Sequence, residues 1–158
     1  MAKYNIRQSK EIAISYQETI NPQMLDNLYK KVIQKLLIEK KFMQKGYTAT
    51  EIAAELDTNS RYISAVCNTR FHMNYSTLIN KYRVEEAMTL LVDRRYLHLK
   101  MEEISDMAGF ANRQSFYAAF YKQKGCTPRD YRMSYLEAHP EVTCAPARKG
   151  RKKQGNAD

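Results

Sequence analysis

The chain has 158 residues, of which 44% are hydrophobic, and this composition suits a packed domain rather than a disordered chain. Its 26 Lys and Arg residues outnumber its 17 Asp and Glu residues by nine. This excess favours a negatively charged binding partner, first nucleic acid and second an anionic membrane surface, over a role of the charge in solubility alone. No apolar run has the length of a signal peptide or a membrane span, so we expect a cytoplasmic protein.

The first predicted helix begins at Pro22, a residue that suits the first turn because its missing N–H needs no partner there. Residues 1–21 are polar with scattered apolar side chains and form an N-terminal segment. After Pro22, apolar residues recur at spacings of three and four, as the buried face of a helix requires. That face is expected to consist of Leu25, Leu28, Val32, Leu36, Leu37 and Phe42.

A short helix, a turn and a second helix follow. In the run TATE, Thr48 and Glu51 fit a capping box, in which the two side chains satisfy early backbone N–H groups. After the turn DTN, Asn59 can cap the second helix. The residues expected to face inward on these two helices are Ile52, Ala53, Leu56, Ile63, Val66 and Cys67.

A long helix over residues 74–92 comes next, with apolar residues again at helical spacing. Its predicted inward-facing residues are Leu78, Ile79, Tyr82, Ala87, Leu90 and Leu91.

The arrangement of short helix, turn and helix then recurs about 52 residues further on. A turn at Gly109, which can take positive φ, separates a short helix from a second helix that ends at Gly125. Thr127 and Pro128 suit the cap and first position of a last helix. The apolar residues expected inside this second unit are Met101, Ile104, Met107, Phe116, Ala119 and Phe120.

These elements predict an all-α fold of about seven helices, in which two helix-turn-helix lobes are joined by a long spacer helix. The domain is expected to occupy residues 22–138. Residues 139–158 contain Pro, Gly and the basic run from Arg148 to Lys153, and they are predicted to form a disordered basic tail.

Acidic residues avoid the second helix of each unit. Neither residues 59–84 nor residues 111–129 contain Asp or Glu, whereas basic residues occur in both stretches, including Arg61, Arg70, Lys81 and Arg83 in the first. Acidic side chains repel phosphate groups, so this segregation predicts which face approaches DNA. In a helix-turn-helix, the second helix lies in the major groove, where base edges differ.

The chain resembles the DNA-binding domain of AraC/XylS-type transcriptional regulators, in its Bacteroidetes-like variant. The resemblance covers roughly residues 28–136. In the second unit it depends on Gly109 with Phe110, on Phe116 and Phe120, on Gly125, on Thr127 with Pro128, and on Tyr131 with Arg132. In the first unit and the spacer it depends on the runs TNSRYIS and YRVEEA, on Asn80 and on Leu90 with Leu91.

The resemblance implies a sequence-specific regulator of transcription that binds promoter DNA in the nucleoid, with RNA polymerase as a candidate second partner and an unknown effector. The positions that contact bases in this family correspond to Arg61, Ser64, Ala65, Arg113, Gln114, Tyr117 and Ala118, and Asn112 is a further candidate for DNA binding. We also expect phosphates to bind to backbone N–H groups at the N-terminal ends of two helices. These ends are at Asn74, Tyr75 and Ser76, and at Thr127.

Four residues depart from the family pattern. His72 stands where Gly is usual, and Cys67 and Ser105 replace the common Phe and Ala. Ala111 cannot cap the second recognition helix, so Asn112 is the expected cap, which competes with its role in contacting bases. Ala65 offers only a methyl group, so the first lobe is expected to discriminate bases less well than the second.

An enzyme is disfavoured by the chemistry-bearing residues. The three cysteines are far apart and, like the histidines, show no zinc spacing, so no metal or cofactor is expected. A methyl-accepting cysteine would need an activated thiolate, and a recombinase tyrosine would need clustered Arg and His residues. Two alternatives remain open: a DNA-architectural or mobile-element accessory protein with the same domain, and an adaptor that binds protein.

Overall fold

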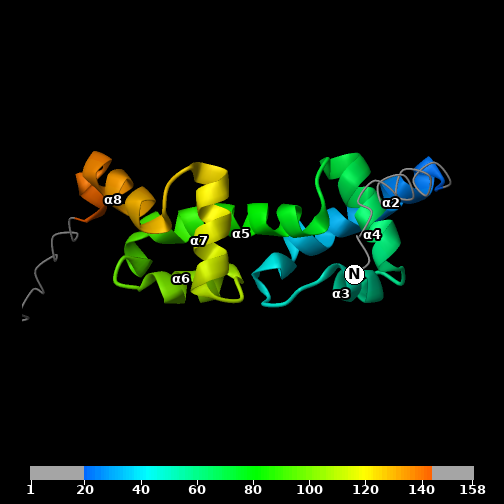
Figure 1. Cartoon of the computed structure of the whole chain (residues 1–158), viewed down its shortest axis with the longest axis horizontal. Coiled ribbons are helices and arrows are strands. Elements are labelled where there is room, and N and C mark those ends of the chain that lie inside the picture. The colour runs from blue at the N-terminus through cyan, green and yellow to red at the C-terminus, as the bar shows by residue number, and fades with distance from the viewer. Residues whose placement is uncertain (1–19, 144–158) are drawn as a thin grey trace, which may run out of the picture.

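Seven α-helices account for most of residues 20–143, the part of the chain that this computed structural model describes (Figure 1). No strand occurs within that part, and the predicted all-α architecture is confirmed. The helices are α2 (Pro22–Ile33), α3 (Ala49–Glu55), α4 (Ser60–Val66), α5 (Tyr75–Val92), α6 (Met101–Ala108), α7 (Arg113–Lys124) and α8 (Pro128–Ala138).

Two hydrophobic clusters form the cores of two lobes at opposite ends of α5 (Figure 1). The first cluster draws on residues 20–79, with α2, α3, α4 and the N-terminal part of α5 around it. The second draws on residues 84–120, with the C-terminal part of α5 and helices α6 and α7 around it. Helix α5 therefore supplies Leu78 and Ile79 to one core and Leu90 and Leu91 to the other, as the spacer helix was predicted to do.

The helix starts follow the predicted capping residues. Thr48 and Glu51 form the complete capping box, with the Glu51 N–H 3.3 Å from Thr48 Oγ1 and the Thr48 N–H 3.2 Å from Glu51 Oε2. The side-chain oxygen of Asn59 accepts the N–H of Tyr62 at 3.1 Å. Such caps satisfy amides that have no partner inside the helix.

Two glycines end helices in the left-handed region, as the sequence predicted for Gly109. Gly109 has φ 94° after α6, and Gly125 has φ 71° after α7. Glycine takes this conformation without the steric cost that a side chain brings. His72 also adopts it, with φ 59°, between α4 and α5.

The first predicted helix is wrong at its C-terminal end. Helix α2 continues as a π turn over Gln34–Ile38, then Lys40 takes φ 50° and a 3₁₀ turn, η2 (Lys41–Met43), follows. Phe42 is buried but belongs to η2 rather than to α2, and Leu37 is 40% exposed. The interruption explains the error, because residues beyond Ile33 no longer follow the 3.6-residue period from which the stripe was extrapolated.

Two arginines are buried and bonded to backbone carbonyl groups. In the first lobe, Arg83 Nε donates to the Phe42 carbonyl at 2.7 Å. In the second, Arg132 Nε donates to the Leu91 carbonyl at 2.8 Å. Burial lowers the pKa of both guanidinium groups. Arg83 was counted among the basic residues of the acid-free stretch 59–84, but its buried side chain adds nothing to the surface that could face DNA.

The residues after α8 are partly ordered, unlike the predicted tail. A 3₁₀ turn covers Pro140–Val142, and the Arg94 guanidinium donates to the carbonyl groups of Glu141 and Val142. The ring of His139 stacks on Tyr135 at a centroid distance of 4.1 Å. The basic run from Arg148 to Lys153 lies outside the described residues. None of the described helices combines the length and apolar character needed to cross a membrane.

Candidate nucleic-acid interface

Each lobe contains a short helix followed, after a turn, by a second helix: α3 with α4, and α6 with α7. Figure 1 shows α4 and α7 as two upright helices, one towards each end of the horizontal α5. Both begin with an Asn cap, Asn59 for α4 and Asn112 for α7, whose side-chain oxygens accept N–H groups of the first turn. The two predicted helix-turn-helix units are therefore present at the two ends of one connecting helix.

The first lobe presents two of its three predicted base-contacting residues. Arg61 and Ser64 are exposed on α4. Ala65 is only 3% exposed and lies in the first core cluster, so its predicted contact with a base is wrong. Helix α4 packs against both α2 and α3, which makes its buried face wider than one stripe of apolar residues.

In the second lobe, the predicted residues gather at the start of α7. Arg113 and Gln114 are exposed, and Ala118 is exposed one turn further on. The side-chain oxygen of Asn112 accepts the Ser115 N–H at 2.8 Å. Asn112 is thus the cap of α7, as expected from Ala111, and only its side-chain amide N–H₂ group can donate to a base.

Arg113 and Tyr117 form a pair along α7. The guanidinium carbon lies 4.8 Å from the centre of the Tyr117 ring, and Nη2 lies 3.3 Å from the Tyr117 hydroxyl. This hydrogen bond raises the pKa of Arg113 above its ordinary value. Tyr117 is half-buried and also packs edge-on against Phe116, at 5.9 Å between ring centres. Tyr117 therefore connects the second core to the exposed guanidinium group.

Two carboxylates stand beside these residues. One hollow is lined by Asn112, Arg113, Gln114 and Tyr117 of α7 and its cap, together with Glu102 and Asp106 of α6. The expectation that acidic residues lie apart from the DNA-facing side chains is therefore wrong for the second lobe. Glu102 and Asp106 are four residues apart and so share one face of α6, a signal that the sequence did contain.

The start of α5 adjoins α4 in a second hollow, whose lining includes Ser64, Asn74, Tyr75 and Ser76. Asn74 caps the Thr77 N–H at 2.8 Å, so the amides of Tyr75 and Ser76 are those left for a ligand. The Tyr75 side chain is buried and donates its hydroxyl to the Tyr47 carbonyl at 2.8 Å. Only the backbone of Tyr75 can therefore contact a phosphate.

The start of α8 is less suited to phosphate than the start of α5. Thr127 Oγ1 accepts the N–H of Asp130 at 3.1 Å, and Pro128 has no N–H. The amide of Arg129 is what remains in the first turn, and the carboxylate of Asp130 lies in the same turn. The prediction for Thr127 thus reduces to one backbone donor.

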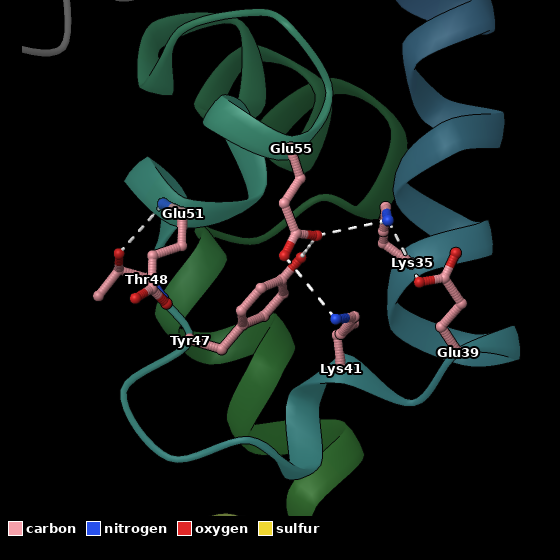
Figure 2. Close-up of polar contacts among 7 residues, drawn as sticks. All are labelled: Lys35, Glu39, Lys41, Tyr47, Thr48, Glu51 and Glu55. Carbon is pink, nitrogen blue, oxygen red and sulfur yellow. Dashed lines mark hydrogen bonds and ion pairs between the residues drawn. The ribbon is translucent and has the colours of Figure 1, made fainter.

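A polar cluster fixes α3, the helix on which α4 packs (Figure 2). Glu55 on α3 accepts the Tyr47 hydroxyl at 2.8 Å and lies 3.4 Å from Lys35 Nζ and 3.8 Å from Lys41 Nζ. The hydrogen bond from Tyr47, followed by the charges of Lys41 and Lys35, lowers the pKa of Glu55. Burial and the contact with Glu55 raise the pKa of Tyr47. The cluster ties α3 to the segment that follows α2.

The thiol of Cys67 is buried in the first core, as its interpretation as a core residue predicted. Burial raises its pKa to about 11. A thiol with a raised pKa is a poor nucleophile at neutral pH, because the reactive form is the thiolate. The described part of the chain contains no group of three or more His, Cys, Asp or Glu residues arranged to hold a metal ion.

Comparison with known proteins gives one family and several similar structures. A family model described as a helix-turn-helix domain matches residues 52–134. The HTH-type transcriptional regulator YtdP of Bacillus subtilis (strain 168) is 28% identical over 85 residues, which are 54% of this chain and 11% of that protein. The chain thus spans about a tenth of the length of this curated relative.

Two solved structures share the fold at comparable identity. The C-terminal domain of the two-component response regulator yesN from Fusobacterium nucleatum is 29% identical with a TM-score of 0.57, over 65% of this chain and 96% of that one. The C-terminal domain of AraT, a response regulator from Geobacillus stearothermophilus, is 26% identical with a TM-score of 0.58, over 73% of this chain and 88% of that one.

Proposed function

Since the chain belongs to the AraC-type helix-turn-helix family, we propose that it is a transcriptional regulator that binds promoter DNA and reads two adjacent major-groove segments. The observation that carries this proposal is the placement of two helix-turn-helix units at the two ends of α5. In such a unit the second helix enters the major groove, with its N-terminal residues at the base edges. Here these helices are α4 and α7.

The second lobe is the stronger reader of sequence in this proposal. Arg113 can bind guanine through two hydrogen bonds, and Gln114 can bind adenine in the same way. Ala118 can contact a thymine methyl group. The carboxylates of Glu102 and Asp106 border the same hollow and can accept the N4 amino group of cytosine, while they disfavour a phosphate at that place. The second lobe therefore combines donors and acceptors.

The first lobe supplies fewer contacts to bases and a better site for the DNA backbone. Arg61 and Ser64 are its exposed candidates on α4. Ser64 lies beside the backbone amides of Tyr75 and Ser76, which can bind a phosphate at the start of α5. Contacts of this kind fix the position of a protein on the duplex without reading its sequence.

A binding selection from random duplexes tests the proposal. Two recognition helices on one connecting helix should enter major grooves about one helical turn, ~34 Å, apart and protect roughly 20 base pairs on one face of the DNA. The selected sites should contain two blocks of preferred sequence. An architectural or mobile-element accessory protein would instead bend DNA with little sequence preference, so a selection without two blocks would contradict our proposal.

Replacing Arg113 with Ala separates reading of bases from attraction to phosphates. Loss of a base contact should weaken binding to the selected site by about 1–3 kcal/mol and leave binding to scrambled duplexes almost unchanged. Titrations of both duplexes at several salt concentrations measure the difference. Lys122→Ala, on the exposed surface of the same helix, serves as the matched control. Equal losses on both duplexes would identify Arg113 as a phosphate contact.

A further inference from the structure

The segment Phe42–Lys45, here called the strut, belongs to the first lobe by sequence but packs on the second. A β-carbon added to Gly109, at the end of α6, would lie 2.5 Å from the Phe42 carbonyl oxygen and 2.6 Å from that of Met43. Real β-carbons do not approach backbone atoms so closely. The backbones of the two lobes therefore meet at this place because residue 109 has no side chain.

The strut is also fixed to the middle of α5. Arg83 Nε donates to the Phe42 carbonyl at 2.7 Å, and Arg83 Nη2 donates to the Gln44 carbonyl at 3.0 Å. The Phe42 ring lies 6.0 Å from that of Tyr82 on the same helix. The hydrogen bond to the Phe42 carbonyl is buried and so is shielded from water. The Phe42 carbonyl thus contacts Arg83 of the spacer and lies against Gly109 of the second lobe.

Ion pairs border this contact. Lys45 Nζ, at the end of the strut, lies 2.6 Å from Asp106 Oδ1 on α6. Lys40, just before the strut, lies 3.3 Å from Glu86 on α5. Both pairs are partly exposed, so each contributes little to stability by itself. The Lys40–Glu86 pair holds the segment before the strut on α5. The Lys45–Asp106 pair, together with the close contact at Gly109, opposes rotation of the second lobe about α5.

We infer that the strut and Gly109 set the orientation of the second lobe relative to the first, and thereby the spacing between the two DNA segments that the protein accepts. This inference rests on the proposed function. If α5 alone fixed the spacing, nothing at Gly109 would matter beyond its own turn. A change of one base pair moves a DNA segment by ~3.4 Å and turns it by roughly 35° around the duplex, so a fixed angle between lobes would discriminate strongly between spacings.

The variant Gly109→Ala tests the inference, and Gly125→Ala is its matched control. Both positions end a helix with positive φ, so both variants carry the same kind of backbone strain. A β-carbon on Gly125 meets nothing within 4 Å, whereas one on Gly109 collides with the strut. A difference between the two variants therefore reports the contact between lobes rather than the strain of the turn.

The first measurement needs no DNA. Spin labels at Asn68→Cys, beyond α4, and Lys122→Cys, on α7, would report the distance between the lobes in a variant whose native cysteines are replaced by Ala. Pulsed electron resonance should give one narrow distance distribution for the labelled parent and for Gly125→Ala. Gly109→Ala should broaden or shift it. An unchanged distribution for Gly109→Ala, or an equal change for Gly125→Ala, would overturn the inference.

The second measurement uses selected duplexes whose two blocks are moved apart or together by one base pair. The unmodified protein and Gly125→Ala should lose about tenfold or more in affinity for each shifted site, as for a mismatched base pair. Gly109→Ala should lose roughly threefold or less, because its lobes can follow the blocks. If selection yields no two blocks, the proposed function fails, while the distance measurement still decides the geometry.

The Lys45–Asp106 pair supplies a second set of variants, which applies even if Gly109→Ala does not fold. The spacing preference is the ratio of the affinity for the selected site to the affinity for a site shifted by one base pair. Lys45→Asp should lower this ratio by roughly two- to fivefold, since two carboxylates then repel each other. Adding Asp106→Lys should restore it by re-forming the pair with opposite polarity. Spacing preference is a ratio of two affinities, so the altered charge largely cancels. Unchanged spacing preference in Lys45→Asp would count against the strut.

Discussion

His72 occupies a backbone conformation that favours glycine, with φ at 59° directly after the π turn Cys67–Phe71. The left-handed region costs a residue with a side chain about 1–2 kcal/mol relative to glycine. The family resemblance also places glycine at this position. His72 is exposed, so no buried contact of its ring offsets this cost.

Replacing His72 with Gly should raise the free energy of unfolding by up to about 1 kcal/mol, because the gain in the folded state exceeds the added freedom of the unfolded chain. Urea-induced unfolding followed by circular dichroism measures the change. His72→Ala keeps the strained conformation and should bring no such gain. A His72→Gly variant no more stable than the parent would show that the strain is relieved elsewhere.

Glu55 is the residue whose protonation should matter most for the first lobe. Its pKa is lowered in the folded protein, first by the Tyr47 hydrogen bond and then by Lys41 and Lys35. A group whose pKa is depressed on folding contributes stability above its unfolded pKa, and that stability is lost as the pH falls through the folded value. The relevant window therefore begins at the ordinary value of 4.5 and extends to lower pH.

The variant Tyr47→Phe should lose stability at neutral pH and show a shallower decline of stability below pH 4.5, since the main cause of the lowered pKa is removed. Unfolding free energies measured across the acidic range test this. Tyr121→Phe, at a position 60% exposed, is the control and should follow the parent. Parallel pH profiles for Tyr47→Phe and the parent would show that Glu55 does not contribute through Tyr47.

Helix existence and helix starts could be predicted from sequence because both depend on local chemistry. Caps such as Thr48 with Glu51 and Asn59 satisfy amides within their own turn, so three or four residues specify them. The end of α2 could not be predicted, because the left-handed Lys40 has no glycine to indicate it. Local patterns therefore identified the elements better than they identified where an irregular one ends.

The candidate site was predicted less completely, since it depends on contacts between elements. Ala65 is buried on α4, a helix that packs against both α2 and α3, and periodicity within α4 carries no information about two such neighbours. Nothing in the sequence around Arg83 indicates its burial, because the carbonyl groups that bind it lie about 40 residues earlier in the chain. The assignment of Arg113, Gln114 and the other contacts to DNA remains a prediction.

At the scale of the helices, the stability of each lobe depends on the packing of its recognition helix, α4 or α7, against the rest of that lobe. Phe120 of α7 is fully buried in the second core, Leu90 of α5 is 6% exposed there, and Ile63 of α4 is fully buried in the first. These side chains hold the recognition helices on their lobes. Their removal should leave cavities, because the surrounding helices can relax only in part.

Each of the variants Leu90→Ala, Phe120→Ala and Ile63→Ala should lower the free energy of unfolding by about 2–5 kcal/mol, with Phe120→Ala towards the upper end. Thermal and urea unfolding measure the losses. Met133→Ala, on the exposed surface of α8, should change little. Unchanged stability in both Leu90→Ala and Phe120→Ala would mean that the register of the helices in the second lobe is wrong.

At the scale of the whole molecule, the formal excess of nine positive charges overstates what the described surface offers to DNA. Arg83 and Arg132 are buried, and Arg70 lies 2.6 Å from Asp26. The basic run from Arg148 to Lys153 contributes five of the positive charges and lies outside the described residues. Its part in binding is therefore best measured directly.

Deleting residues 144–158 should weaken binding to all duplexes alike and flatten the dependence of the binding constant on salt. The slope of log K against log salt is negative. Its magnitude should decrease by about 0.9 for every phosphate that the shortened protein no longer neutralises, because fewer counterions are released. Titrations of selected and scrambled duplexes at several salt concentrations provide the test. A loss confined to the selected duplex would instead mean that the segment takes part in base recognition.

The order of the two cores along the chain has a consequence for biosynthesis. Every buried residue of the first core precedes every buried residue of the second, with the change falling between Ile79 and Val84 inside α5. A ribosome that has released the first half of α5 has therefore delivered the complete first core, which can form while the rest is translated. The second lobe then folds onto a helix already anchored at one end. Because each core consists of residues from its own part of the chain, neither core needs contacts with residues far away in the sequence before it can form.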